Sequence, residues 1–210
     1  MLELERALSF IHSWVNQRWA TLLLGNKSIV QNLNIAALNV YFYEGRHWNW
    51  MRHKQTFTIP ASVTPGDTYT ATTTYNVVDV QNICDDTGGS CVSWAYSPAG
   101  SDCDLTPGKF YWKGFNKEVI FARWDTERVI EMTYYGYNLY TELDEPIMDE
   151  TILIPEVFLP AIYHFTLGVI YPHYTQYWEA REVSAYQMGI NYLANIAKSQ
   201  TTIINQIRPR

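Results

Sequence analysis

The spacing of apolar residues changes twice along this chain of 210 residues, and the two changes constrain the fold more than any other feature. Apolar residues follow helical spacing up to about residue 50, alternate with polar residues from Phe57 to Tyr137, and return to helical spacing after Pro155. Helices and strands bury side chains with different periods. The pattern therefore predicts an α+β protein: an antiparallel β domain, residues 55–149, inserted into a helical domain of residues 1–54 and 150–200.

The helical domain is expected to be a four-helix bundle. The first helix begins at Leu4 and ends near Gly25, and Ser28 has the character of an N-cap for the second. Pro155 opens the third helix, and Pro172 is expected to interrupt it before a fourth helix. The faces expected to form the bundle core are Leu8, Ile11 and Val15; Leu33, Ala37 and Val40; Ile162, Phe165 and Val169; and Ile190, Leu193 and Ala197.

The β domain is rich in Thr, Val and Tyr and is broken by Gly and Pro, as is typical of strands joined by turns. A hairpin is expected where residues 110–113 and 119–124 flank a turn around Gly114. Residues 68–80 are expected to form one long strand or a bent pair. The other expected strands are residues 57–60, 91–96 and 129–135.

Cys84, Cys91 and Cys103 all lie in one polar segment of the β domain. An odd number of cysteines cannot pair fully within one chain, and their irregular spacing beside aspartates does not fit a zinc site. Free thiols in a reducing cell are the favoured state. A bridge between Cys84 and Cys91 is the alternative.

The net charge of −6 argues against a general nucleic-acid binder, because such proteins meet phosphates with clustered Lys and Arg. The densest basic stretch, residues 46–54, is interpreted as a helix end, and the N-terminus lacks the pattern of a signal peptide. No catalytic motif, metal-ligand spacing or phosphate-binding loop is present in the sequence, so we expect a protein that is not an enzyme and has no cofactor. The scattered histidines are His12, His47, His53, His164 and His173.

The last ten residues, 201–210, are expected to form an extended tail, because they lose the helical period. Such a tail can add a strand to the sheet of another protein. In this hypothesis Ile203 or Ile204, with Ile207, would enter pockets while Arg208 and Arg210 meet carboxylates on the partner. The alternative is a frayed terminus.

Tyr and Trp are abundant, with 16 and 8 copies, and both types are enriched at protein interfaces. A second hypothesis follows from them: a carbohydrate-binding or receptor-binding module in which aromatic side chains of the sheet stack on sugar rings. The residues expected to do so, or to face a protein partner, are Trp94, Tyr96, Tyr111 and Trp112.

Four short matches give the chain a family resemblance. They are the first helix with Asn16 and Trp19, the pair Trp48-x-Trp50 before a strand, the acidic turn at residues 141–144, and Ile154-Pro155-Glu156 followed by His164. Together with the order of elements, these resemble the head-to-tail adaptor proteins of tailed bacteriophages, the podovirus tail tubular proteins included. The aromatic segment between residues 83 and 107, and Pro172, depart from that pattern.

The resemblance implies a structural virion protein, assembled in the host cytoplasm and located in the neck between capsid and tail. It implies a ring of about twelve copies, closed by rotation, that binds the portal protein and a downstream tail or nozzle protein. DNA would pass through the channel without specific binding, and the C-terminal tail would contact the portal. A tail nozzle or stopper subunit is an alternative within the same class.

Overall fold

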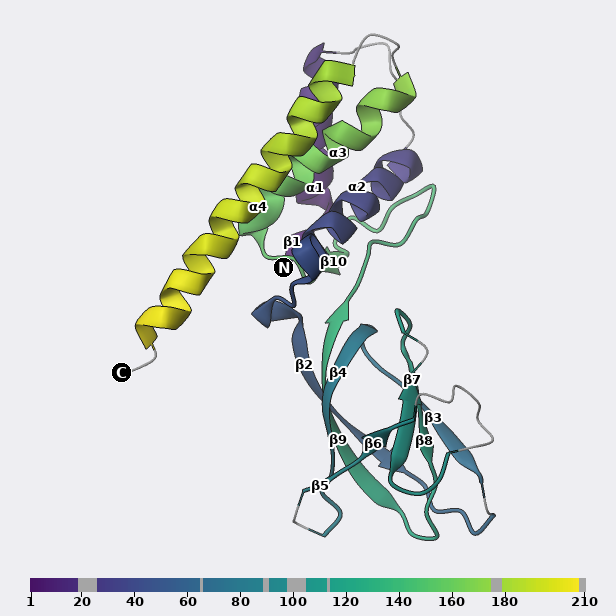
Figure 1. The fold of residues 1–210 in the computed structure, drawn as a ribbon. Coiled ribbons are helices and arrows are strands. Elements are labelled where there is room, and N and C mark those ends of the chain that lie inside the picture. Colours follow the sequence, from purple (N-terminus) through teal and green to yellow (C-terminus); the bar gives the residue numbers. More distant parts are fainter. Residues whose placement is uncertain are drawn as a thin grey trace. The chain divides into compact units, whose positions relative to one another are not determined.

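The structure is a computed structural model that describes residues 1–18, 26–64, 66–88, 91–97, 105–112, 114–174 and 179–207. The chain divides into two compact units (Figure 1). The helical unit comprises Met1–His47 and Leu139–Arg210, and the β unit comprises Trp48–Asn138. The sequence had placed the limits of the inserted domain at residues 55 and 149.

The helical unit combines α-helices with one small sheet. The sheet pairs β1 with β10 antiparallel, so that Leu2 lies opposite Ile152, and both side chains are fully buried. Burial of this pair ties the N-terminus to the segment before α3. The elements are β1 (Leu2–Glu3), α1 (Leu4–Arg18), α2 (Asn26–Tyr41), η1 (Tyr43–Gly45), β10 (Thr151–Ile152), η4 (Glu156–Phe158), α3 (Leu159–Tyr174) and α4 (Glu179–Ile207).

The predicted four-helix bundle is wrong, although the mixed α+β class is consistent with the structure. α3 packs against α4 and α2 and, over a smaller area, against α1. Among the described residues, no comparable contact joins α1, α2 and α4 to one another. In a bundle every helix packs on neighbours around one shared axis. The sequence pattern predicts which helix faces are buried, but it does not predict that α1, α2 and α4 all pack against α3.

Most of the predicted helix faces are buried, and on α4 the expected core residues Leu193 and Ala197 are confirmed. The buried positions of α4 recur every fourth residue: Ala185, Gly189, Leu193 and Ala197. Ile190, expected in the core, is only half-buried. Small residues allow close approach of the helices, and a Cβ added at Gly189 would lie 2.8 Å from Cε1 of Phe165. The side chains of two predicted core residues, Val15 and Val169, lie outside the described part.

The β unit contains two four-stranded sheets with the strand orders β2-β9-β4-β5 and β3-β8-β7-β6. All pairings are antiparallel except β6 with β7. The core is built from side chains of both sheets, including Phe57, Phe121 and Ile130. The elements are η2 (Asn49–Met51), β2 (Arg52–Ile59), β3 (Thr68–Thr72), β4 (Asn76–Asp85), β5 (Val92–Ser93), β6 (Ala95–Tyr96), β7 (Lys109–Trp112), β8 (Glu118–Ala122) and β9 (Arg128–Tyr137).

The expected hairpin is confirmed, because β7 and β8 pair antiparallel on either side of the turn with Gly114. Residues 68–80, expected as one strand or a bent pair, divide into β3 and β4, which belong to different sheets. The basic stretch at residues 46–54 does not end α2, which ends at Tyr41, but it does follow helix ends: Arg46 is the C-cap of η1 and Arg52 is the C-cap of η2. Alternation alone does not reveal where a strand leaves one sheet for another.

The structure joins Cys84 and Cys91 by a disulfide, with 5.1 Å between the Cα atoms. The expectation of free thiols is therefore wrong for this pair. The reason is the register of β4 and β5, which places Cys84 opposite Ser93 and returns the chain within reach. Cys103 lies outside the described residues.

The predicted extended tail is also wrong where the structure describes it, because α4 continues as a helix to Ile207. Residues 198–207 contain neither Gly nor Pro, and extending an existing helix by one residue costs far less than starting a new one. The β-branched Thr-Thr-Ile-Ile run only weakly opposes helix formation. α3 likewise continues past Pro172 to Tyr174.

Candidate protein interaction site

Asn34 of α2 fixes the segment that leaves the β unit. Its Nδ2 donates a hydrogen bond to the backbone oxygen of Tyr140 at 2.9 Å, and its Oδ1 accepts one from the Tyr140 amide at 3.0 Å. Asn34 and Tyr140 are both buried, and the Tyr140 hydroxyl donates to the backbone oxygen of Leu2 at 3.0 Å. Burial raises the pKa of Tyr140, so this hydroxyl stays a donor. A side chain thus supplies the backbone pairing that a neighbouring strand would supply in a sheet.

Beyond Tyr140, residues 141–150 form an acidic turn that we call the elbow. It carries Glu142, Asp144, Glu145, Asp149 and Glu150 and no Lys or Arg. The elbow is closed on itself, because the carboxylate of Glu150 accepts hydrogen bonds from the Thr141 amide at 2.7 Å and from its hydroxyl at 2.8 Å. An ordered turn of this composition presents negative charge at a fixed place on the helical unit.

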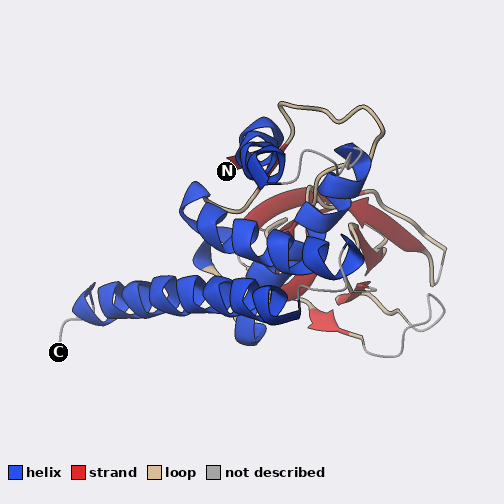
Figure 2. Cartoon of the chain, turned by 90° about the horizontal axis from the view of Figure 1, so that it is seen from above, coloured by secondary structure: helices blue, strands red, loops and turns tan. Residues whose placement is uncertain are grey.

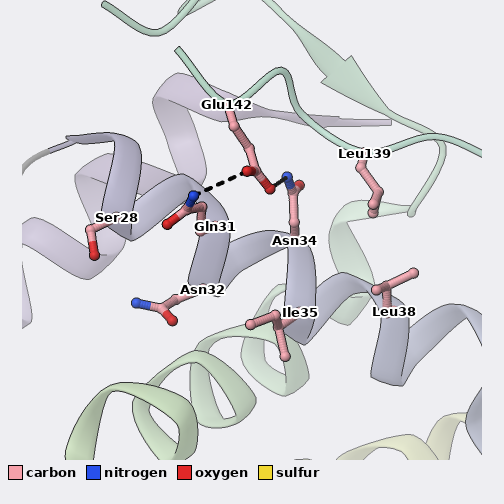
Figure 3. A pocket seen from close by; sticks show the side chains of 8 residues that line it. All are labelled: Ser28, Gln31, Asn32, Asn34, Ile35, Leu38, Leu139 and Glu142. Atoms are coloured by element: carbon pink, nitrogen blue, oxygen red, sulfur yellow. Dashed lines mark hydrogen bonds between the residues drawn. The ribbon is translucent and has the colours of Figure 1, made fainter. Parts of the chain in front are cut away.

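A groove of about 700 Å³ runs between the elbow and α2, and we call it the elbow groove (Figure 3). Gln31 and Asn34 point toward Glu142, whose carboxylate accepts a hydrogen bond from each at 3.2 Å. Leu139 points toward Leu38 across the groove. The groove thus has a polar, negatively charged side and an apolar side. Its lining residues are Ser28, Gln31, Asn32, Asn34, Ile35, Leu38, Leu139 and Glu142.

Ile35 makes the groove unusual for a solvent-facing surface. It lies on the outer face of α2 with 45% of its surface exposed, beside the half-buried Leu38 and Leu139. An isolated exposed aliphatic side chain is ordinary, but one inside a concave, partly apolar surface is typical of a binding site. One signal for this site is present in the sequence: Asn34 stands between the apolar residues Leu33 and Ile35 on α2.

A second hollow, of about 760 Å³, lies in the β unit beside Arg123. The Arg123 guanidinium donates to Asp67 Oδ2 at 2.7 Å and to the backbone oxygens of Pro60 and Ala61 at 3.0 and 2.6 Å. A hydrogen bond from Ser62 and the neighbouring Arg123 hold the pKa of Asp67 below its ordinary value. All three guanidinium nitrogens are used within the protein, so this arrangement braces a loop.

The predicted aromatic residues separate into two groups. Tyr96, Tyr111 and Trp112 come together at the edge formed by β6 and β7: the ring centroid of Tyr96 lies 4.6 Å from that of Trp112 and 6.4 Å from that of Tyr111. Tyr96 is 44% exposed. Trp94 does not join them, because it is buried and packs edge-on against Phe121 in the core.

The structure describes only some of the C-terminal residues that were predicted to bind a partner. Ile203, Ile204 and Ile207 lie in the last turns of α4, and Arg208 and Arg210 lie outside the described residues.

Within the described residues there is no group of three or more His, Cys, Asp and Glu side chains able to hold a metal ion. His53 lies against Tyr75 and Tyr134, and His164 stacks on Tyr192 at 5.5 Å. Burial lowers the pKa of both histidines, which favours neutral packed rings.

Comparison with known proteins adds no identification. No family model matches the chain, and no curated protein matches it. Within the described residues, none of the helices combines the length and the apolar character needed to cross a membrane.

Proposed function

We propose that this protein is a structural virion subunit, a ring-forming adaptor in the neck of a tailed bacteriophage. In this role it joins the portal protein to a downstream tail or nozzle protein and continues the DNA channel, without catalysing a reaction. The resemblance set out above motivates the proposal. The observation that carries it is the length of α4.

α4 is much longer than the helix on which it packs. It has 29 residues, whereas α3 has 16. The two helices are antiparallel neighbours, since Gly189 meets Phe165 and Tyr192 stacks on His164. By this register α3 and η4 accompany α4 only to about residue 198, so the remaining turns extend about 14 Å beyond them (Figures 1 and 2). A helix gains most of its stability from packing, so a helix that extends beyond its partner helix favours completion by another chain.

The helical unit also has large apolar side chains that are exposed instead of packed in its core. They lie on α1, α2, the elbow, η4 and α4. Exposed apolar groups on several faces are typical of a subunit that contacts more than one neighbour. The residues are Phe10, Ile35, Leu143, Ile147, Met148, Val157, Tyr186, Met188 and Tyr192.

The charge of the chain fits a passive DNA channel. The net charge is −6, and the elbow concentrates five carboxylates. A basic wall would hold the phosphates of passing DNA, whereas an acidic subunit leaves DNA free to move.

The proposal is tested by measuring the mass of the purified protein over a range of concentrations and by imaging it in the electron microscope, alone and mixed with portal rings. We expect closed rings and binding to the portal. A protein that stays monomeric at high concentration and ignores portal rings would refute the proposal.

A second candidate function is sugar binding by the β unit, and one observation favours it. Tyr96, Tyr111 and Trp112 form an aromatic edge on which Tyr96 is 44% exposed. Exposed aromatic faces suit a sugar ring. Saturable binding on a glycan array that is lost on Tyr96→Ala would support this function, and the burial of Trp94 weakens it.

A further inference from the structure

We propose that the elbow groove receives the terminal segment, residues 201–210, of a neighbouring copy of this chain. The inference rests on the proposed ring and names the contact that builds it. It assigns the terminal segment to a second copy in place of the portal.

The groove and the terminal segment are complementary in charge. The elbow contributes five carboxylates, of which Asp144 is paired with Lys27 of α2 at 3.7 Å. Glu142 lines the groove and is held there by two amide donors. The terminal segment contributes Arg208 and Arg210 and no acidic residue. Opposite charges on two surfaces steer them together and fix their register.

The two surfaces are also complementary in apolar character. The terminal segment contributes Ile203, Ile204 and Ile207, and Ile35, Leu38 and Leu139 provide the apolar side of the groove. A helix that lays an apolar face into a groove is a common mode of peptide recognition. The groove of about 700 Å³ is open to solvent and is similar in volume to known ligand-binding clefts.

Geometry excludes the groove of the same copy. The Tyr186 hydroxyl of α4 donates to Asn39 Oδ1 at the C-terminal end of α2, at 3.2 Å. α2 and α4 run in the same direction (Figure 1). The groove extends back from Leu38 toward Ser28, whereas α4 carries Ile203 forward by about 26 Å from Tyr186. The terminal segment therefore moves away from its own groove.

A contact between two different patches on identical chains is head to tail. Each copy donates a terminal segment to one neighbour and accepts one from the other, and rotation decides whether the series closes. This is the contact that a ring requires, and it needs no other protein.

The test uses two full-length variants and their mixture. One variant lacks residues 201–210, which lie beyond the α3 contact. The other is Ile35→Lys, which places a cation in the groove at an exposed position. Ile35→Glu is the matched control, because it removes the same apolar contact without repelling Arg208 and Arg210. Circular dichroism of each variant confirms that the helices are retained.

Each variant alone is expected to lose self-association by at least tenfold in dissociation constant, and Ile35→Glu to lose less. Mixed in equal amounts, the tail-deleted chain and Ile35→Lys share one intact contact, so they should form a 1:1 dimer and nothing larger. If each variant alone still forms rings as the parent does, the inference is overturned while the ring proposal stands. If the tail-deleted chain still forms rings but no longer binds the portal, the terminal segment belongs to the portal contact. If the deletion abolishes association and Ile35→Lys does not, the segment binds elsewhere. A parent that never associates would overturn both proposals.

Discussion

Replacing Asn34 with alanine should destabilise the helical unit strongly, because Asn34 satisfies two buried backbone groups at once. The substitution leaves the Tyr140 amide and carbonyl, now bonded at 3.0 and 2.9 Å, without a partner. Both residues are nearly inaccessible to water, at 4% and 3% exposed. Each buried polar group that loses its partner costs about 1–3 kcal/mol, and the two costs overlap, so we expect a loss of about 2–4 kcal/mol in the free energy of unfolding.

Urea unfolding followed by the helical circular dichroism signal measures this loss directly, and an unchanged dependence on urea shows that the unfolding reaction is the same. Gln31→Ala is the control, because it removes one exposed hydrogen bond to the same elbow and should change stability by less than about 0.5 kcal/mol. Asn34→Asp keeps the acceptor but loses the donor and brings a second carboxylate beside Glu142, so it should destabilise at least as much as alanine. An Asn34→Ala protein as stable as the control would refute the reasoning.

Three further predictions follow. Gly189→Ala should lower the free energy of unfolding by up to about 2 kcal/mol, because the added methyl meets the Phe165 ring at 2.8 Å and this overpacking outweighs the gain of about 1 kcal/mol in helix propensity. Adding Phe165→Leu in the same chain should relieve the loss. A Gly189→Ala protein more stable than the parent would contradict this packing. Lowering the pH through 6.5, the ordinary pKa of histidine, should lower the free energy of unfolding, because burial depresses the pKa of His164 in the folded protein. The stability contributed by neutral His164 is fully present above pH 6.5 and falls as the pH falls below it. If the free energy of unfolding of His164→Gln depends on pH as steeply as that of the parent, the prediction is wrong. Reducing the Cys84–Cys91 disulfide should lower the free energy of unfolding of the β unit by about 2–3 kcal/mol, measured by urea unfolding with and without a thiol reductant. The Cys91→Ser variant should not respond to the reductant. Equal stability of the oxidised and reduced parent would show that the bridge does not constrain the chain.

The sequence predicted the elements well where one periodic pattern runs without interruption. Leu33, Ala37 and Val40 are buried as expected, and the turn at Gly114 separates two paired strands. Such features depend on interactions between near neighbours in the chain, so the local pattern contains the information. The failures concern long-range contacts. Nothing near residue 74 indicates that β3 and β4 join different sheets.

The candidate site could not be predicted because its parts are distant in the sequence. Asn34 and Tyr140 lie 106 positions apart, and only the folded chain shows that one completes the hydrogen bonding of the other. One residue of the predicted α4 face, Ile190, was wrong for a related reason. Apolar Ile190 looked like a core residue, whereas close packing on Phe165 selects the glycine before it.

The way the chain enters and leaves its β unit has an evolutionary consequence. β2 and β9 are adjacent antiparallel strands, and Arg52 pairs with Tyr135 close to both boundaries of the unit. Paired residues of this kind are about 5 Å apart, so entry and exit occupy nearly the same point. Recombination at these two points can therefore replace the whole β unit with another domain without changing the helical unit.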